Sequence, residues 1–159
     1  MTTHGLGDLD DIGEIDELDW VVRTGVYRFI SKHERPPTSD EAAGALGLPR
    51  ERAELAFRRL DRHHALFLEP GTLTIRMAHP FSGVPTPFRV QAQGHAYWAN
   101  CAWDMLGIPA ALHADAELAA RCGDPVDPAG TRVTLAVAGG RVAGHGEVVH
   151  FPLPFRRWY

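Results

Sequence analysis

A segment rich in proline and glycine divides this chain into two parts with different residue patterns. Residues 79–88 (HPFSGVPTPF) contain three prolines and one glycine. Such a composition is typical of an inter-domain linker or of an ordered crossing loop. We therefore expect two small modules, over residues 18–78 and 88–159, joined by a proline-rich linker over residues 79–87.

The composition favours a folded protein without a membrane span. The chain has 159 residues, of which 45% are hydrophobic and 23% charged, an ordinary globular mixture. Its mean hydropathy is -0.18, and no apolar run approaches the roughly 18 residues that a membrane helix needs. The acidic start of the chain is unlike the basic start of a secretory signal peptide. We expect a cytoplasmic protein whose two cysteines are reduced thiols.

The first 17 residues are acidic and contain three glycines. We expect residues 1–17 to be a flexible, solvated leader, because closely spaced carboxylates repel one another. The alternative is a negatively charged arm that binds a basic partner.

Helical patterns dominate residues 18–63. Apolar residues recur at near-helical spacing from Leu18 to Ile30. Helices are also predicted over residues 39–46, with Thr38 or Ser39 as the cap, and over residues 50–63. Two short apolar runs around a Pro-Gly turn then predict a hairpin over residues 66–77. Three helices and a hairpin outline a winged helix, with a helix-turn-helix over residues 39–63.

The second helix of this helix-turn-helix raises the question of DNA binding. It carries five arginines over residues 50–62, which suit phosphate contacts. Acidic residues dilute this charge, however, and the whole chain has a net charge of -4. We expect the helices to be a scaffold and no nucleic acid to be a partner. A winged-helix regulator that senses a ligand stays as an alternative.

The second module mixes strand and helix patterns, which predicts an α+β protein whose C-terminal module has a mixed β-sheet. Strands are predicted over residues 88–90, 133–137 and 147–153, with a hairpin turn at residues 139–140. Residues 95–107 (HAYWANCAWDMLG) predict a helix that ends at Gly107 and Pro109.

That helix carries the residues with the most distinctive chemistry. Cys101 and Asp104 are three residues apart and project from the same face of a helix. A thiolate is a nucleophile and a ligand for soft metals, and a carboxyl in an apolar setting holds its proton more tightly. The pair suits binding of a soft metal centre followed by proton delivery. The alternative is a buried cysteine that acts only as a small apolar residue.

Several stretches, taken in order, resemble the organomercurial (alkylmercury) lyase family over roughly residues 33–155. The resemblance lies in Arg35-Pro36-Pro37-Thr38 through Ala43-Gly44-Ala45-Leu46, Pro49 and Glu51-Arg52-Ala53, in Cys101-Ala102-Trp103-Asp104-Met105-Leu106 with Pro109-Ala110, and in Arg121-Cys122-Gly123-Asp124-Pro125-Val126.

The resemblance implies protonolysis of a carbon–mercury bond. In that family a cysteine attacks mercury and an aspartate protonates the departing carbon, roles that fall on Cys101 and Asp104 here as metal-binding and catalytic residues. Cys122 matches a cysteine that is not catalytic. The substrate is a small molecule, an organomercurial or another soft-metal or thiol-reactive ligand. No cofactor is expected, and an external thiol serves as reductant or acceptor.

The sequence departs from the family pattern near its end. The family's second catalytic cysteine follows the segment that resembles residues 148–154, and the sequence ends at Tyr159. Either the sequence is a partial version, or the protein has no such thiol. His145 and His150 are substitute donors, although ordinary strand positions also explain them. A non-catalytic relative that binds soft metals or other ligands is therefore the main alternative to an enzyme.

Overall fold

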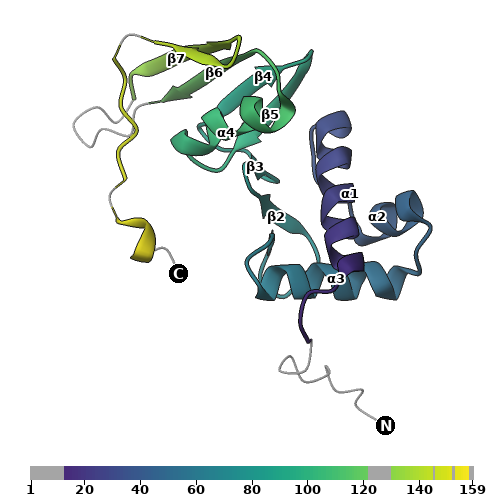
Figure 1. Cartoon of the computed structure of the whole chain (residues 1–159). Helices are drawn as coiled ribbons and strands as arrows, with labels where there is room; N and C mark the ends of the chain where they lie inside the picture. The colour runs from purple at the N-terminus through teal and green to yellow at the C-terminus, as the bar shows by residue number, and fades with distance from the viewer. Residues whose placement is uncertain (1–12, 122–129, 145, 152, 158–159) are drawn as a thin grey trace. The chain divides into compact units, whose positions relative to one another are not determined.

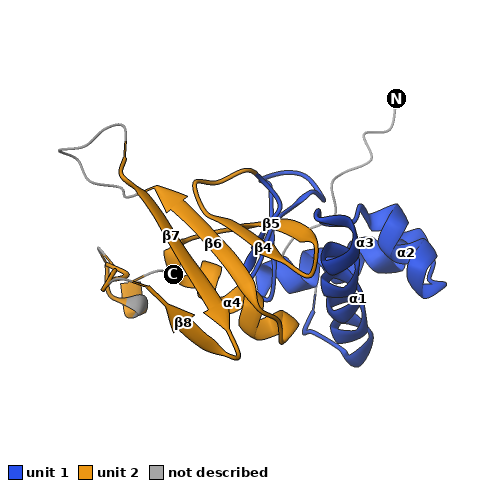
Figure 2. Ribbon diagram, turned by 90° about the horizontal axis from the view of Figure 1, so that it is seen from above, with its two compact units in different colours: residues 1–84 blue, residues 85–159 orange. Residues whose placement is uncertain are grey.

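The computed structural model describes residues 13–121, 130–144, 146–151 and 153–157. The chain divides into two compact units, residues 1–84 (unit 1) and 85–159 (unit 2), coloured separately in Figure 2. In the described residues, unit 1 contains three α-helices and short strands, and unit 2 contains a sheet, one α-helix and a short 3-10 helix (Figure 1). The protein is thus of the α+β class. No helix in the described ranges is both long and apolar enough to cross a bilayer.

The three helices of unit 1 lie where the sequence predicts them. They are α1 (Glu17–His33), α2 (Ser39–Leu46) and α3 (Arg50–Arg62). Thr38 caps α2 in a reciprocal box with Glu41, and Asp16 caps α1 in the same way with Asp19. Helix α1 therefore begins inside the region expected to be a leader, because Asp16 supplies the cap. Residues 1–12 lie outside the described part.

Apolar residues at helical spacing form the core of unit 1. Val22, Val26 and Ile30 of α1 are four residues apart and buried. The buried residues of α3 are Ala53, Ala56, Phe57 and Leu60. Both sets follow the period of one helix face, so the two helices bury matching stripes.

Ion pairs join the start of α1 to α3. Asp19 is fully buried and accepts from Nη1 of Arg52 at 2.7 Å, with Nη1 of Arg59 at 3.4 Å. The same two arginines bind Asp16, while Arg50 binds Glu54. Three of the arginines weighed above as DNA contacts are therefore engaged by carboxylates within unit 1.

Three short strands complete unit 1. β1 (Phe67–Leu68) pairs with β2 (Ile75–Ala78), and β2 pairs with β3 (Phe81–Ser82), both antiparallel. The predicted hairpin is thus present, with Gly71 at a φ of 72° in its turn. β3 lies in the segment expected to be a linker.

The sheet of unit 2 has the order β5-β4-β6-β7-β8 in the described residues. Its strands are β4 (Arg89–Ala92), β5 (His95–Ala99), β6 (Ala116–Arg121), β7 (Arg132–Ala138) and β8 (Arg141–Ala143). Every pair is antiparallel, so the expectation of a mixed sheet is wrong. The predicted strand at residues 133–137 and the turn at residues 139–140 are confirmed. A short 3-10 helix, η2 (Phe155–Arg157), follows.

The prediction of one helix over residues 95–107 is wrong in its first half. Residues 95–99 form strand β5, and helix α4 spans Ala102–Leu112. Gln93 and Gly94 have φ values of 53° and 79°, as a tight hairpin turn requires, and this turn pairs β5 with β4. Tyr97 and Ala99 are buried at alternate positions, as a strand requires. The sequence pattern does not reveal this, because the aromatic residues around them suit a helix as well as a strand.

The end of α4 also differs from the prediction. Pro109 lies inside the helix, which continues to Leu112 and is capped by His113 in a left-handed conformation. Proline removes one donor but leaves its own carbonyl available. The carbonyl of Pro109 accepts from the N–H of Ala114 at 3.1 Å, so the last turn still closes.

The predicted strand over residues 147–153 is absent from the described residues of that stretch. The last paired strand, β8, ends at Ala143. Val148 is 87% exposed, so the apolar residues here do not cover a sheet. Val149, His150, Phe151 and Leu153 instead line a pocket.

The strand register gives the unit 2 sheet two chemically different faces. Val90, Leu118 and Leu135 are directly opposite one another and lie on the face where the buried residues gather. Helix α4 packs on β4, β5 and β6 (Figure 2). Directly paired residues point the same way, so Arg89, Ala119 and Thr134 lie on the opposite face.

Candidate functional site

The N-terminus of α4 places Cys101 at the end of a fixed strand. Strand β5 ends at Ala99, whose N–H donates to the carbonyl of Phe88 at 3.0 Å and whose carbonyl accepts from Oγ1 of Thr86 at 2.6 Å. The hydroxyl of Thr86 also accepts from the N–H of Phe88. These bonds hold the backbone two residues before Cys101.

Cys101 occupies the N-cap position of α4 with extended backbone angles. Cysteine is not among the residues that favour this position, and its side chain makes no capping hydrogen bond. The thiol instead donates to Oδ2 of Asp104, with 3.4 Å between the sulfur and the oxygen. The three-residue spacing of Cys101 and Asp104 therefore does bring the two side chains into contact. Cys101 lies at the N-cap position, one residue before the helix, rather than within it.

Burial raises the pKa of the Cys101 thiol above its ordinary value of 9.0. The carboxylate of Asp104 raises the pKa further, because a negative charge disfavours a second one beside it, whereas the backbone amides of Asp104 and Trp103 lower it. The raising effects prevail. At neutral pH the sulfur therefore keeps its proton, with a carboxylate positioned to receive it.

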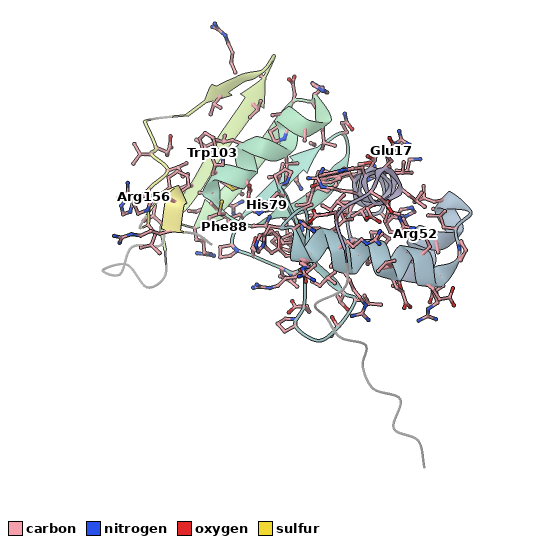
Figure 3. All side chains as sticks on the ribbon, turned by 60° about the horizontal axis from the view of Figure 1, so that its bottom comes forward. Glu17, Arg52, His79, Phe88, Trp103 and Arg156 are labelled. Atoms are coloured by element: carbon pink, nitrogen blue, oxygen red, sulfur yellow. The ribbon has the colours of Figure 1, made fainter. Side chains whose placement is uncertain are left out.

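A pocket of about 310 Å³ opens beside this pair. Phe88 and Trp103, both labelled in Figure 3, lie at the pocket together with Phe151. The rings of Trp103 and Phe151 are edge to face, with centroids 6.2 Å apart. The other lining residues are Cys101, Ala102, Val149, His150 and Leu153. The sulfur thus faces an apolar, largely aromatic space of the size of a small organic ligand.

Of the remaining candidate residues, one lies at the pocket and two lie outside the described part of the chain. His150 lines the same pocket as Cys101. Cys122 and His145 lie outside the described residues. Within those residues, no group of three or more thiol, imidazole or carboxylate side chains is arranged to hold a metal ion.

Sequence reasoning missed the parts of the site that come from loops. The residues not singled out are Thr86, Phe88, Phe151 and Leu153. Their roles depend on chain segments that meet only in the fold. One signal in the sequence is the run of apolar residues after Glu147, which is also consistent with a strand.

Unit 2 is thus an antiparallel sheet with a thiol and a carboxyl in contact at the start of its helix, beside an apolar pocket. Residues 81–159 match the family model of alkylmercury lyase, MerB. Through this part the chain belongs to the alkylmercury lyase family. No curated protein matches the chain significantly.

A solved structure supports the same fold. The chain is similar to a crystal structure described as the mercury-bound form of MerB2, with a TM-score of 0.63 and 20% sequence identity. The likeness covers 85% of this chain and 63% of that chain. At this identity the match establishes the fold alone, and this chain spans less than two thirds of the length of that protein.

Proposed function

We propose that this chain cleaves carbon–mercury bonds by protonolysis, with Cys101 as the nucleophile and Asp104 as the proton carrier. The observation that supports the proposal most directly is the 3.4 Å contact between the thiol and the carboxylate at an apolar pocket. Family membership through residues 81–159 agrees with it.

The first step transfers a proton and forms a sulfur–mercury bond. Asp104 takes the thiol proton as the sulfur approaches the mercury of R–Hg–X, and X leaves with its electron pair. Mercury is soft and prefers thiolate to oxygen donors. Because burial holds the thiol pKa high, ionisation is coupled to metal binding rather than preceding it.

The second step breaks the carbon–mercury bond. Asp104 returns its proton to the carbon, and the electron pair of that bond becomes the new C–H bond. Mercury stays divalent throughout, so nothing is oxidised or reduced. Two external thiols then take the metal as a dithiolate; one of their protons goes to the sulfur of Cys101, which leaves as a thiol, and the other goes to solvent. In this scheme the external thiol is an acceptor.

The pocket lining suits the organic group. Phe88, Trp103 and Phe151 offer ring faces and edges to an apolar or aromatic substituent. The pocket would keep water away from the departing carbon, so that the carboxyl of Asp104 is the nearest proton source.

The test is release of benzene from a phenylmercury salt in excess thiol, followed by gas chromatography. We expect Cys101→Ser and Asp104→Asn each to lower the rate by at least about 100-fold, as loss of an acid–base group does. Cys122→Ser and Asp40→Asn are matched controls and should retain the parent rate. Equal rates in parent, Cys101→Ser and Asp104→Asn proteins would exclude this function.

The same samples separate a catalyst from a metal-binding relative. Native mass spectrometry would show mercury retained on Cys101. Retention without benzene release would support the non-catalytic alternative.

A further inference from the structure

The face of the unit 2 sheet opposite α4 carries an unusual excess of positive charge. By the strand register, the charged side chains on this face are Arg89, Glu117, Arg121, Arg132 and Arg141. Four are cationic and one is anionic, whereas the whole chain has a net charge of -4. We call this surface the arginine face.

A hollow of about 570 Å³ lies in the arginine face. Its apolar lining comes from three neighbouring strands and the residue after them, namely Leu118, Ala119, Leu135, Ala136, Ala143 and Gly144. Arg89, Gln91, Glu117, Arg132 and Thr134 contribute the polar side chains around it. The volume falls within the range of small-molecule sites.

Arg89 and Arg132 at this hollow have no carboxylate partner among the described residues. In unit 1, by contrast, Arg35, Arg52 and Arg59 all bind carboxylates. The guanidinium of Arg89 lies 4.2 Å from the centroid of the Trp98 ring, which fixes its position without neutralising its charge.

The backbone brings the two guanidinium groups within reach of one ligand. Arg89 is opposite Ala119, which is opposite Thr134, so β4 and β7 are separated by one strand, about 10 Å in all. Arg132 is one pleat from Thr134 on the same face. Arg89 and Arg132 both line the hollow, so a ligand bound in it can contact both side chains.

We propose that this hollow binds an organic phosphate of nucleoside monophosphate size. The two guanidinium groups, which have no carboxylate partner in the part of the chain that the structure describes, match the charge of about -2 on a phosphate monoester, and their planar forks suit its oxygens. Glu117 and Gln91 would accept hydrogen bonds from hydroxyl or amino groups of the ligand.

The site is separate from the one built around Cys101. The two pockets share no lining residue, and by the strand register the charged side chains of the arginine face point away from the face on which α4 packs. The inference therefore stands whether or not the chain cleaves organomercurials.

The test uses adenosine monophosphate as the probe and amide NMR titration of the full chain. We expect saturable shifts in β4, β6 and β7, with no comparable change in α4. Arg89→Gln and Arg132→Gln should each weaken binding by at least about tenfold, as loss of a charge-assisted hydrogen bond does. Arg156→Gln, an exposed position outside the hollow, is the matched control and should bind as the parent does.

The outcomes separate the possible occupants. Weaker binding of adenosine than of the monophosphate would support the phosphate contact. Absence of saturable shifts with the parent protein at millimolar probe, or equal affinity in both hollow variants and the control, would overturn the proposal. Binding of single-stranded oligonucleotides without binding of the monophosphate would also overturn it and identify a polynucleotide surface instead.

Discussion

The reactivity of Cys101 follows from its burial and from one neighbouring carboxylate. A raised pKa means that the thiol is half ionised only at a pH above the ordinary value of 9.0. We predict that alkylation of Cys101 by iodoacetamide rises with pH to a midpoint above 9.0. The measurement is peptide mass spectrometry, which reports Cys101 separately from Cys122.

The Asp104→Asn variant tests the electrostatic part of this effect. Removing the negative charge favours the thiolate, so the alkylation midpoint should move to lower pH. Asp40→Asn is the control, because Asp40 lies in α2, far from Cys101 in the sequence, and it should leave the alkylation midpoint unchanged. A midpoint that stays fixed in Asp104→Asn would mean that the carboxylate is not beside the sulfur in solution.

Thr86 is predicted to hold the strand end that precedes Cys101. In Thr86→Val, the N–H of Phe88 and the carbonyl of Ala99 both lose a partner. We expect the free energy of unfolding in urea to fall by about 1–3 kcal/mol. Thr86→Ser retains the hydroxyl and should lose much less. Equal losses in the two variants would assign the effect to packing of the methyl group.

At the scale of elements, unit 1 depends on a buried ion pair between helices. Asp19 is fully buried and Arg52 is its closest partner at 2.7 Å. We predict that Arg52→Leu destabilises the protein by up to about 3 kcal/mol, because the only cationic partner left to the buried carboxylate in the described residues is Arg59, at 3.4 Å. The measurement is urea unfolding by circular dichroism. Arg58→Leu, on the exposed side of α3, is the control and should change stability little; a loss as large as that of Arg52→Leu would contradict this account.

Elements governed by local signals could be predicted from the sequence, and those governed by distant contacts could not. The cap at Thr38 and the Gly139-Gly140 turn are local signals, and α2, the strand over residues 133–137 and this turn lie where expected, whereas β8 was not predicted. Strand β5 was mistaken for a helix because its aromatic residues suit both states, and only pairing with β4 decides between them.

In the candidate site, too, the local contact could be predicted from the sequence and the distant contacts could not. The spacing of Cys101 and Asp104 sufficed to bring them together, since three residues join the N-cap and the first turn of a helix. The pocket walls were not predictable, because Phe88 and Phe151 are far apart in the sequence.

At the scale of the whole molecule, the two units use charge in different ways. Carboxylates of unit 1 engage Arg52, Arg59 and Arg50 within its helical framework. Unit 2 carries the thiol–carboxyl pair and pocket on one side of its sheet and the arginine face on the other. The family match falls on residues 81–159, so unit 2 is where the proposed chemistry is to be tested.

Single-turnover protonolysis tests the central claim most directly. The parent protein, in excess over phenylmercury and without external thiol, should release one benzene per mercury bound and keep the metal on Cys101. Asp104→Asn should hold the intact phenylmercury adduct on Cys101 and release benzene far more slowly. Benzene release from Asp104→Asn at the parent rate, or a phenylmercury adduct that persists on the parent protein, would contradict the account.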